Sequence, residues 1–336
     1  MKKFLFSIIL FLIVIVSTIV LGEVIVRIFA PQPIVPRFVE SAPWGIRKVI
    51  GNVDAIHKTA EYSYRYRTNS QGFRGTKEYT INPQDGVYRI VVQGDSVTLG
   101  YGVKDNETFS QVLEDMLIKK GINAEVINMG VSGFGTAEEL IQFHNVAKKY
   151  KPNLVIMGYF QNDDKNNHVS KLYQVKDGQL QRNSQEFQPG IYLRDRISKI
   201  PFYNFLSQNS HLLTFFRNYF SGYIWRQLKE QIPENVKSKK SNEKASVLTQ
   251  LLLNKYIEEI TMSGTNLILF DIVDKRFHTD FPKNLKLNKH TKIVETYSDF
   301  IKAKENGTKL YFDVDSHPIA AGHKLIAKII AENIDQ

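Results

Sequence analysis

Short apolar runs alternate with helical patterns along the chain from residue 86 onward. The apolar runs occupy residues 88–93, 124–128, 153–159 and 266–272. Between and after them, apolar side chains recur at the spacing of one helix face in residues 108–120, 136–149, 247–262 and 319–334. Continuous apolar runs are typical of strands buried on both faces, and strand–helix alternation is typical of parallel sheets. We therefore predict a three-layer α/β/α domain with a central parallel sheet over residues 86–336.

The first 30 residues have a different pattern. Lys2 and Lys3 precede an uncharged stretch, residues 4–22, that is long enough to cross the hydrocarbon core of a bilayer. No convincing small-x-small cleavage site follows it. We predict an uncleaved signal anchor over residues 1–30, with the two lysines on the cytoplasmic side and the later residues on the extracytoplasmic side. A cleaved signal peptide and a buried helix of a cytoplasmic enzyme are the alternatives.

Two further segments lack the strand–helix alternation. Residues 31–85 are turn-rich and carry a cluster of tyrosines and arginines at positions 62–67, and we predict an appendage that packs on the main domain. Residues 165–246 are rich in aromatic and basic side chains, and we predict an insertion in the α/β domain. A lid over the site and a simple surface elaboration are both compatible with this insertion. Within it, residues 237–244 are expected to form a solvated loop.

Composition narrows the class of protein. The 336 residues are 43% hydrophobic and 23% charged, which is typical of a globular protein and excludes a disordered chain. The absence of cysteine excludes disulfides, thiolate metal sites and a cysteine nucleophile. The net charge of +10 is compatible with an anionic polymer or membrane surface. No nucleic-acid-binding signature, dinucleotide fingerprint or P-loop occurs, so neither nucleic acid nor a cofactor is expected.

Candidate chemistry lies at the predicted strand ends, where ligands bind in open α/β sheets. The first strand is followed by Gly94-Asp95-Ser96, the second by Gly130, and the third by Asn162. A serine between a strand and a helix is well placed as a nucleophile but needs a base. Of the eight histidines, His317 has the best context, because it directly precedes the last helix and Asp315 lies two residues before it.

These segments together resemble the SGNH/GDSL hydrolase superfamily. The resemblance rests on Gly94-Asp95-Ser96-Val97-Thr98-Leu99-Gly100, on Gly130, on Asn162-Asp163, and on Asp315-Ser316-His317-Pro318 with Gly322. It covers roughly residues 86–164 and 265–334 and implies a flavodoxin-like α/β fold. It also implies that Ser96 is the nucleophile, His317 the base and Asp315 the residue that orients it. The backbone N–H groups of Ser96 and Gly130 and the side-chain amide of Asn162 would form the oxyanion hole.

Several assignments stay open at this stage. The commonest family pattern places the acid three residues before the histidine, where this chain has Val314; Asp313 is therefore an alternative to Asp315, and a Ser–His dyad is another. Asp95 is expected to shape its loop. Asp163 and Asp164 are adjacent, but no further ligands gather near them in the sequence, so no metal is predicted. We expect His323 to lie on the surface.

The resemblance implies a serine esterase that forms an acyl-enzyme on Ser96. The predicted anchor with an exported catalytic domain suggests that the substrate is an ester, such as an O-acyl group, of a cell-envelope glycan or lipid. An O-acyltransferase that uses the same triad and a surface polysaccharide as acceptor is an alternative. A non-catalytic envelope scaffold or glycan-binding protein is a second one. The sequence does not indicate the oligomeric state.

Overall fold

The computed structural model describes residues 2–184, 190–230, 246–275 and 278–334. Its centre is a five-stranded sheet in the order β11-β10-β7-β5-β6, and every neighbouring pair is parallel. The strands are β5 (Tyr88–Gln93), β6 (Ala124–Asn128), β7 (Leu154–Tyr159), β10 (Asn266–Asp271) and β11 (Thr291–Val294). The predicted parallel α/β fold is thus confirmed. The strand β11, which follows a turn-rich stretch, was not part of the prediction.

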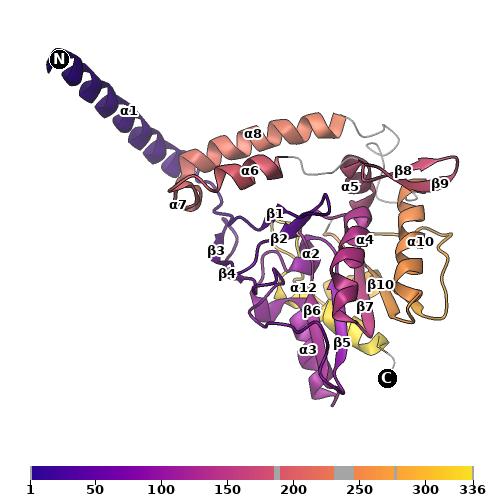
Figure 1. The fold of residues 1–336 in the computed structure, drawn as a ribbon. Coiled ribbons are helices and arrows are strands. Elements are labelled where there is room, and N and C mark those ends of the chain that lie inside the picture. Colours follow the sequence, from indigo (N-terminus) through magenta and orange to yellow (C-terminus); the bar gives the residue numbers. More distant parts are fainter. Residues whose placement is uncertain (1, 185–189, 231–245, 276–277, 335–336) are drawn as a thin grey trace.

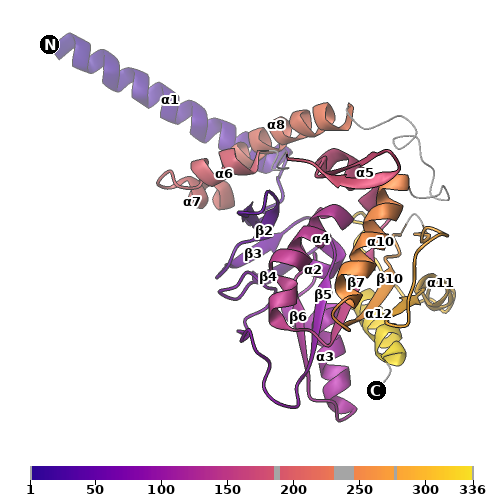
Figure 2. The same ribbon diagram turned by 45° about the vertical axis from the view of Figure 1, so that its right-hand side comes forward.

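Helices cover both faces of the sheet (Figures 1 and 2). One face packs against α3 (Phe109–Lys119) and α12 (Ala320–Asn333). The other packs against α4 (Thr136–Asn145) and α10 (Val247–Thr261). Alternate residues of a strand point to opposite faces, so Ile90 and Val92 of β5 join the first core and Val91 joins the second. This pattern explains why the strands are apolar throughout.

Shorter elements complete the α/β body. They are α2 (Ser96–Leu99), α11 (Tyr297–Glu305) and the 3₁₀ turns η1 (Asp105–Glu107) and η2 (Ala147–Tyr150). The predicted helix over residues 136–149 is divided, because Val146 leaves the helical conformation and η2 follows it.

The segment before β5 contains two antiparallel hairpins. The first joins β1 (Val39–Ser41) to β2 (Arg47–Val49), and the second joins β3 (Asp54–Lys58) to β4 (Ser63–Arg67). Side chains from this segment, including Tyr66 and Phe73, belong to the same core as the α4 face of the sheet. The hairpins therefore pack on the α/β body.

The segment after β7 contains α5 (Asp163–Ser170), the hairpin of β8 (Tyr173–Lys176) and β9 (Gln179–Arg182), α6 (Ile191–Ile197), α7 (Tyr203–Asn209) and α8 (His211–Glu230). The expected solvated loop at 237–244 lies outside the described residues. Figure 1 shows α6, α7 and α8 at one end of the molecule, beside the end of α1.

The first helix, α1 (Lys2–Phe29), extends away from the rest of the chain (Figures 1 and 2). It has a mean hydropathy of 3.1 over its most apolar stretch, and none of that stretch is buried. By length and composition this helix is able to cross a membrane, and a signal sequence would share both properties.

Candidate active site

Ser96 lies at a sharp turn between a central strand and a short helix. The turn begins at Gly94, whose φ of 151° and close neighbour require glycine, because a Cβ there would lie 2.1 Å from Thr98 Oγ1. Asp95 follows, and its Oδ1 accepts a hydrogen bond of 2.9 Å from the Val97 N–H. Ser96 is then the first residue of α2, at the carboxyl end of β5. The turn places the serine hydroxyl at the edge of the sheet, half-buried.

His317 connects Ser96 to Asp315. The Nε2 atom of His317 lies 2.8 Å from Ser96 Oγ, and its Nδ1 lies 2.6 Å from Asp315 Oδ1. The backbone N–H of His317 donates to the same carboxylate oxygen at 3.0 Å. With the ring proton on Nδ1 and donated to Asp315, Nε2 is free to accept the serine proton. The three residues that the sequence analysis selected are therefore in the order that base-assisted nucleophilic attack requires.

The Asp315 carboxylate is held in its charged form. Burial alone would raise its pKa, but hydrogen bonds and electrostatic attraction from His317, with a further hydrogen bond from Tyr62, outweigh burial and lower it. Oδ2 accepts from the Tyr62 hydroxyl at 2.9 Å, so both carboxylate oxygens are engaged. A carboxylate fixed in this way holds the imidazole in one tautomer and orientation.

The alternative acid, Asp313, lies apart from the histidine. Its Oδ2 pairs with Lys309 Nζ at 2.8 Å, and 79% of its side-chain surface is exposed. This exposed ion pair with Lys309 lowers the pKa of Asp313. Of the two aspartates, the geometry brings only Asp315 to the histidine.

The β3–β4 hairpin supplies groups to this site that the sequence analysis did not assign to it. Glu61, in the hairpin turn, accepts hydrogen bonds from the Val314 N–H at 2.8 Å and the Asp315 N–H at 2.6 Å. Tyr62, beside it, binds the Asp315 side chain. Both residues lie far from Asp315 in the sequence, so no local pattern predicts these contacts. The cluster of tyrosines and arginines at positions 62–67 was the only feature that drew attention to this segment.

Tyr101 packs against His317 on the hairpin side, and the buried His57 packs against Tyr101. The Tyr101 ring lies 4.7 Å from the His317 ring, centre to centre, and the His57 ring lies 4.7 Å from that of Tyr101. Burial first, and then the charge of Arg74, lower the pKa of His57 to about 4, so this second imidazole stays neutral near neutral pH. His57 Nδ1 is bonded to the Tyr64 hydroxyl at 2.8 Å, which gives it a structural partner.

The expected oxyanion residues differ in their availability. The Gly130 N–H donates to Asn128 Oδ1 at 3.0 Å, and a Cβ at Gly130 would lie 2.4 Å from the Leu99 backbone nitrogen. Gly130 thus allows the end of β6 to pack closely against α2, and its N–H is occupied. Gly133, three residues later, is half-buried with a φ of 77°, and its N–H has no hydrogen-bond partner among the described residues.

Asn162 directly precedes α5 and reaches toward the turn that carries Ser96. Its side chain forms a hydrogen bond with the Asp95 carboxyl. Its Oδ1 atom is buried without a partner in the described part of the chain. The amide group of Asn162 therefore lies beside the residue that precedes Ser96, at the third strand end.

Below the serine turn lies a group of buried carboxyls, Asp95, Glu139 and Asp163. Burial, followed by the repulsion of nearby carboxyls, raises the pKa of Glu139 and Asp163 well above the usual range, and burial raises that of Asp95. Asp164 has another role, because it accepts from Thr249 at 2.7 Å. Among the described residues, no three His, Cys, Asp or Glu side chains gather around a common point that suits a metal ion.

His323 was expected from the sequence to lie on the surface, and this prediction is wrong. His323 is fully buried on α12, where its ring lies 6.2 Å from that of Phe109 and Nδ1 accepts from the Phe109 N–H at 3.3 Å. The helical pattern alone did not show which face of α12 meets α3. His323 therefore lies in the core between α12 and α3, and the ring that meets Ser96 is that of His317.

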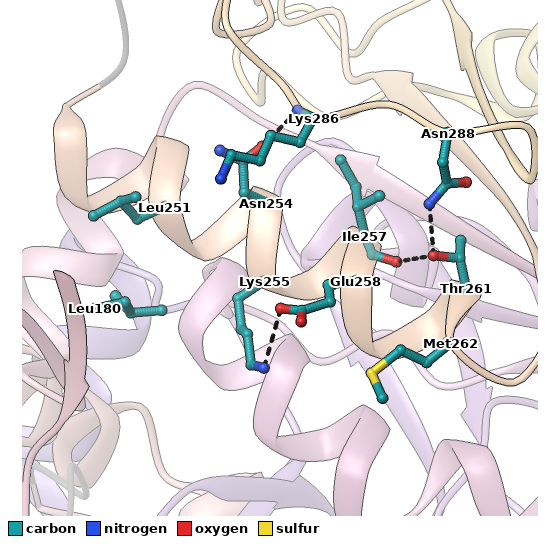
Figure 3. A pocket seen from close by; sticks show the side chains of 10 residues that line it. All are labelled: Leu180, Leu251, Asn254, Lys255, Ile257, Glu258, Thr261, Met262, Lys286 and Asn288. Carbon is teal, nitrogen blue, oxygen red and sulfur yellow. Dashed lines mark hydrogen bonds and ion pairs between the residues drawn. The ribbon is translucent and has the colours of Figure 1, made fainter.

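A cavity of about 700 Å³ adjoins Asp315. Its lining includes Tyr62 and Tyr101 beside Asp315, and Arg27 and Pro31 at and just after the end of α1. A second cavity, of about 620 Å³, lies along α10 (Figure 3). Its polar side chains pair among themselves, as in the ion pair of Lys255 with Glu258. The first cavity is the one beside the triad.

Residues 90–330 match the family model described as GDSL-like lipase/acylhydrolase. No match was found among curated proteins.

Solved structures with a similar chain path include an α/β-hydrolase enzyme from the metagenome of Lake Arreo, Spain. It is 13% identical with a TM-score of 0.41, and the match covers 74% of this chain and 97% of that chain. A lipolytic protein of the G-D-S-L family from Veillonella parvula is 13% identical with a TM-score of 0.40 and coverages of 73% and 96%.

A two-domain esterase active on acetylated mannans is 13% identical with a TM-score of 0.39. The match covers 73% of this chain and 48% of that one, so this chain spans about half the length of the two-domain protein.

Proposed function

The chain belongs to the GDSL-like lipase/acylhydrolase family, and we propose that it is a serine esterase whose nucleophile is Ser96. The observation that carries this proposal is the continuous path of hydrogen bonds from Ser96 Oγ through His317 to Asp315. As Oγ attacks the ester carbonyl carbon, His317 Nε2 takes its proton, and Asp315 stabilises the imidazolium that forms. The carbonyl oxygen becomes the oxyanion of a tetrahedral intermediate.

The intermediate then collapses to an acyl-enzyme. The bond between the carbonyl carbon and the alcohol oxygen breaks, and His317 gives its proton to the departing alcohol. In the second half, His317 takes a proton from water as the water attacks the acyl carbon. The acid leaves, and the proton returns to Ser96 Oγ.

Three donors are proposed for the oxyanion. They are the Ser96 N–H, the Asn162 side-chain amide and an N–H from the loop after β6. For the last, the Gly133 N–H is the better candidate, because it has no partner in the described residues, whereas the Gly130 N–H would first have to leave Asn128 Oδ1. Preorganised donors of this kind supply a large part of the rate enhancement in acyl transfer.

The helix α1 is proposed to be a retained membrane anchor. Glu23, just after the uncharged stretch, accepts hydrogen bonds from the Ser210 hydroxyl and from the His211 and Leu212 N–H groups at the start of α8. Removing α1 would leave these donors without their acceptor, which favours retention over cleavage. Lys2 and Lys3 before the uncharged stretch favour an orientation with the catalytic domain on the extracytoplasmic side of the membrane.

A location at the cell envelope suggests the substrate class, an O-acyl ester of an envelope glycan or lipid. The cavity beside Asp315 has a volume in the usual range for a small-molecule site. The same acyl-enzyme is consumed by water in an esterase and by a sugar hydroxyl in an acyltransferase. The ratio of free acid to acylated sugar, measured with an oligosaccharide acceptor present, distinguishes the two reactions.

The test treats the full-length protein in detergent with a fluorophosphonate probe and follows hydrolysis of p-nitrophenyl acetate. We expect labelling of the wild type and its loss in Ser96→Ala, with hydrolysis reduced at least ~10³-fold. Ser132→Ala, in the loop after β6, is the matched control and should keep both properties. A folded wild type that is neither labelled nor active would overturn the proposal in favour of a non-catalytic scaffold.

A further inference from the structure

The helices α7 and α8 present an aromatic surface that nothing in the described structure covers. Its principal side chains are 50–80% exposed and are Phe202, Phe205, Phe216, Tyr219, Phe220 and Tyr223. The last four recur at the three- and four-residue spacing of one helix face, so they form a stripe along α8. Monomeric soluble proteins rarely leave so many large apolar side chains in water on one surface.

The start of α8 is fixed to the end of the uncharged stretch of α1. The three hydrogen bonds to Glu23 join the first turn of α8 to α1. Arg27 adds a fourth connection, because it donates to the Asn209 carbonyl at 2.8 Å. One residue before Glu23, a Cβ at Gly22 would lie 3.2 Å from Leu212 Cδ2, so the two helices are in van der Waals contact there.

This junction sets the depth of α8 in a membrane. Glu23 is the first charged residue after the uncharged stretch 4–22, and a charged side chain at the end of a spanning segment lies at the headgroup level. The first turn of α8 therefore lies at that level too. In both ribbon views α8 runs crosswise to α1, so a helix that begins at the headgroups continues along the membrane surface (Figures 1 and 2).

The composition of the stripe fits such a position. Tyrosine is favoured where one end of a side chain meets water and the other meets hydrocarbon, and phenylalanine is typical of the apolar face of interfacial helices. Helices that lie in the plane of the interface bury one apolar face to the boundary between headgroups and acyl chains. A second copy of this chain would also cover the stripe, but the attachment of α8 to α1 favours the lipid surface.

We propose that α7 and α8 are interfacial helices that lie on the bilayer and bury their aromatic surface among its lipids. This inference rests on the proposed membrane anchor. It has a consequence for the esterase, because the cavity beside Asp315 opens between the triad and the end of α1. With α8 on the membrane, that cavity lies next to the bilayer surface, within reach of an ester carried by a lipid.

The test uses the absence of cysteine in this chain. The full-length protein is placed in phosphatidylcholine–phosphatidylglycerol vesicles with a single environment-sensitive dye at Tyr219→Cys. Met262→Cys, which is 77% exposed beyond α10, is the control. Lipids that carry a nitroxide near the headgroup should lower the fluorescence at position 219 about 2-fold or more and leave position 262 nearly unchanged. Unchanged thermal unfolding of each labelled variant shows that it is folded.

Further measurements distinguish a failure of the interfacial helices from a failure of the membrane anchor. A third label at Ile13→Cys, the middle of the uncharged stretch, reports on α1 when it is read with lipids that carry the nitroxide deep in the acyl chain. Strong quenching at position 13 with none at position 219 overturns the interfacial helices and leaves the anchor intact, whereas no quenching at position 13 removes the anchor itself. An absence of quenching at position 219, together with a blue-shifted dye emission that is lost at one chain per vesicle, indicates a second copy on the stripe and overturns the proposal.

Discussion

The Tyr62 hydroxyl donates a 2.9 Å hydrogen bond to Oδ2 of Asp315, a residue 253 positions later in the chain. The bond ties the β3–β4 hairpin to the proposed acid, on the carboxylate oxygen that His317 leaves free. Glu61 strengthens the same connection through two backbone N–H groups. The segment before the α/β domain thus shapes the active site directly.

Tyr62→Phe removes this bond and little else. Hydrogen bonds to charged groups contribute about 1.5–3 kcal/mol, so we expect kcat to fall roughly 10- to 100-fold with KM nearly unchanged. Steady-state kinetics with p-nitrophenyl acetate measures the effect. Tyr79→Phe, which removes the bond to the Val126 carbonyl, is the control and should lower stability without lowering kcat. Equal effects of the two variants on kcat would show that Tyr62 has no positioning role.

Replacement by asparagine should reduce kcat strongly at Asp315 and hardly at all at Asp313. Asp315→Asn leaves the shape intact but disfavours the tautomer in which Nδ1 donates, so kcat should fall about 10³- to 10⁴-fold. Asp313→Asn breaks only an exposed pair with Lys309, and kcat should stay within about 2-fold of the wild type. A large loss in Asp313→Asn, measured in the same assay, would return the acid role to Asp313.

Replacing Glu139 should stabilise the protein. Neither carboxylate oxygen of this buried residue has a partner in the described residues, and burial, then the charges of Asp95 and Glu138, raise its pKa. Glu139→Gln should therefore raise the free energy of unfolding by about 1–3 kcal/mol at pH 7 to 8, as measured by urea titration.

The stabilisation that Glu139→Gln provides should be larger at high pH than at low pH. A raised pKa means that the native state binds a proton more readily than the unfolded chain, where the value is near 4.5. The gain from Glu139→Gln should shrink as the pH falls toward 4.5, because the wild-type carboxyl becomes neutral. The neighbouring Glu138→Gln is the contrast, because it breaks a buried pair with Arg47 and should lower stability by roughly 2–4 kcal/mol.

His323 should make the protein sensitive to acid. Burial, followed by the positive charges of His317 and Arg74, lowers its pKa from 6.5 to about 3. The unfolded chain therefore binds a proton that the native state does not, and stability is lost as the pH falls below about 6.5. Between pH 6.5 and 5 the wild type should lose about 2 kcal/mol that His323→Asn does not lose, which urea unfolding at both values measures. A constant difference between the two proteins would contradict the assignment.

The main strands and helices were predictable because local periodicity encodes them. The run of buried residues in β7 and the apolar face of α10 each carry a signal within a short window. The residues selected for chemistry follow the same logic, since Ser96 and Asn162 directly follow strands of one parallel sheet. The strand β11 and the hairpins were not predicted, because β1, β2 and β11 have only three or four residues and β3 and β4 carry charged and polar side chains in place of an apolar run.

Sequence alone therefore determined the α/β class, the apolar first helix, and the residues Ser96, His317 and Asp315 as a set worth testing. Only the tertiary structure decided which aspartate meets His317, that Tyr62 and Glu61 of the hairpin hold it, that His323 is buried, and that the Gly130 N–H is occupied. The physical reason is the range of the interactions involved. Periodicity reports which residues avoid water, whereas a hydrogen bond between residues far apart in the chain exists only once packing has fixed both of its atoms.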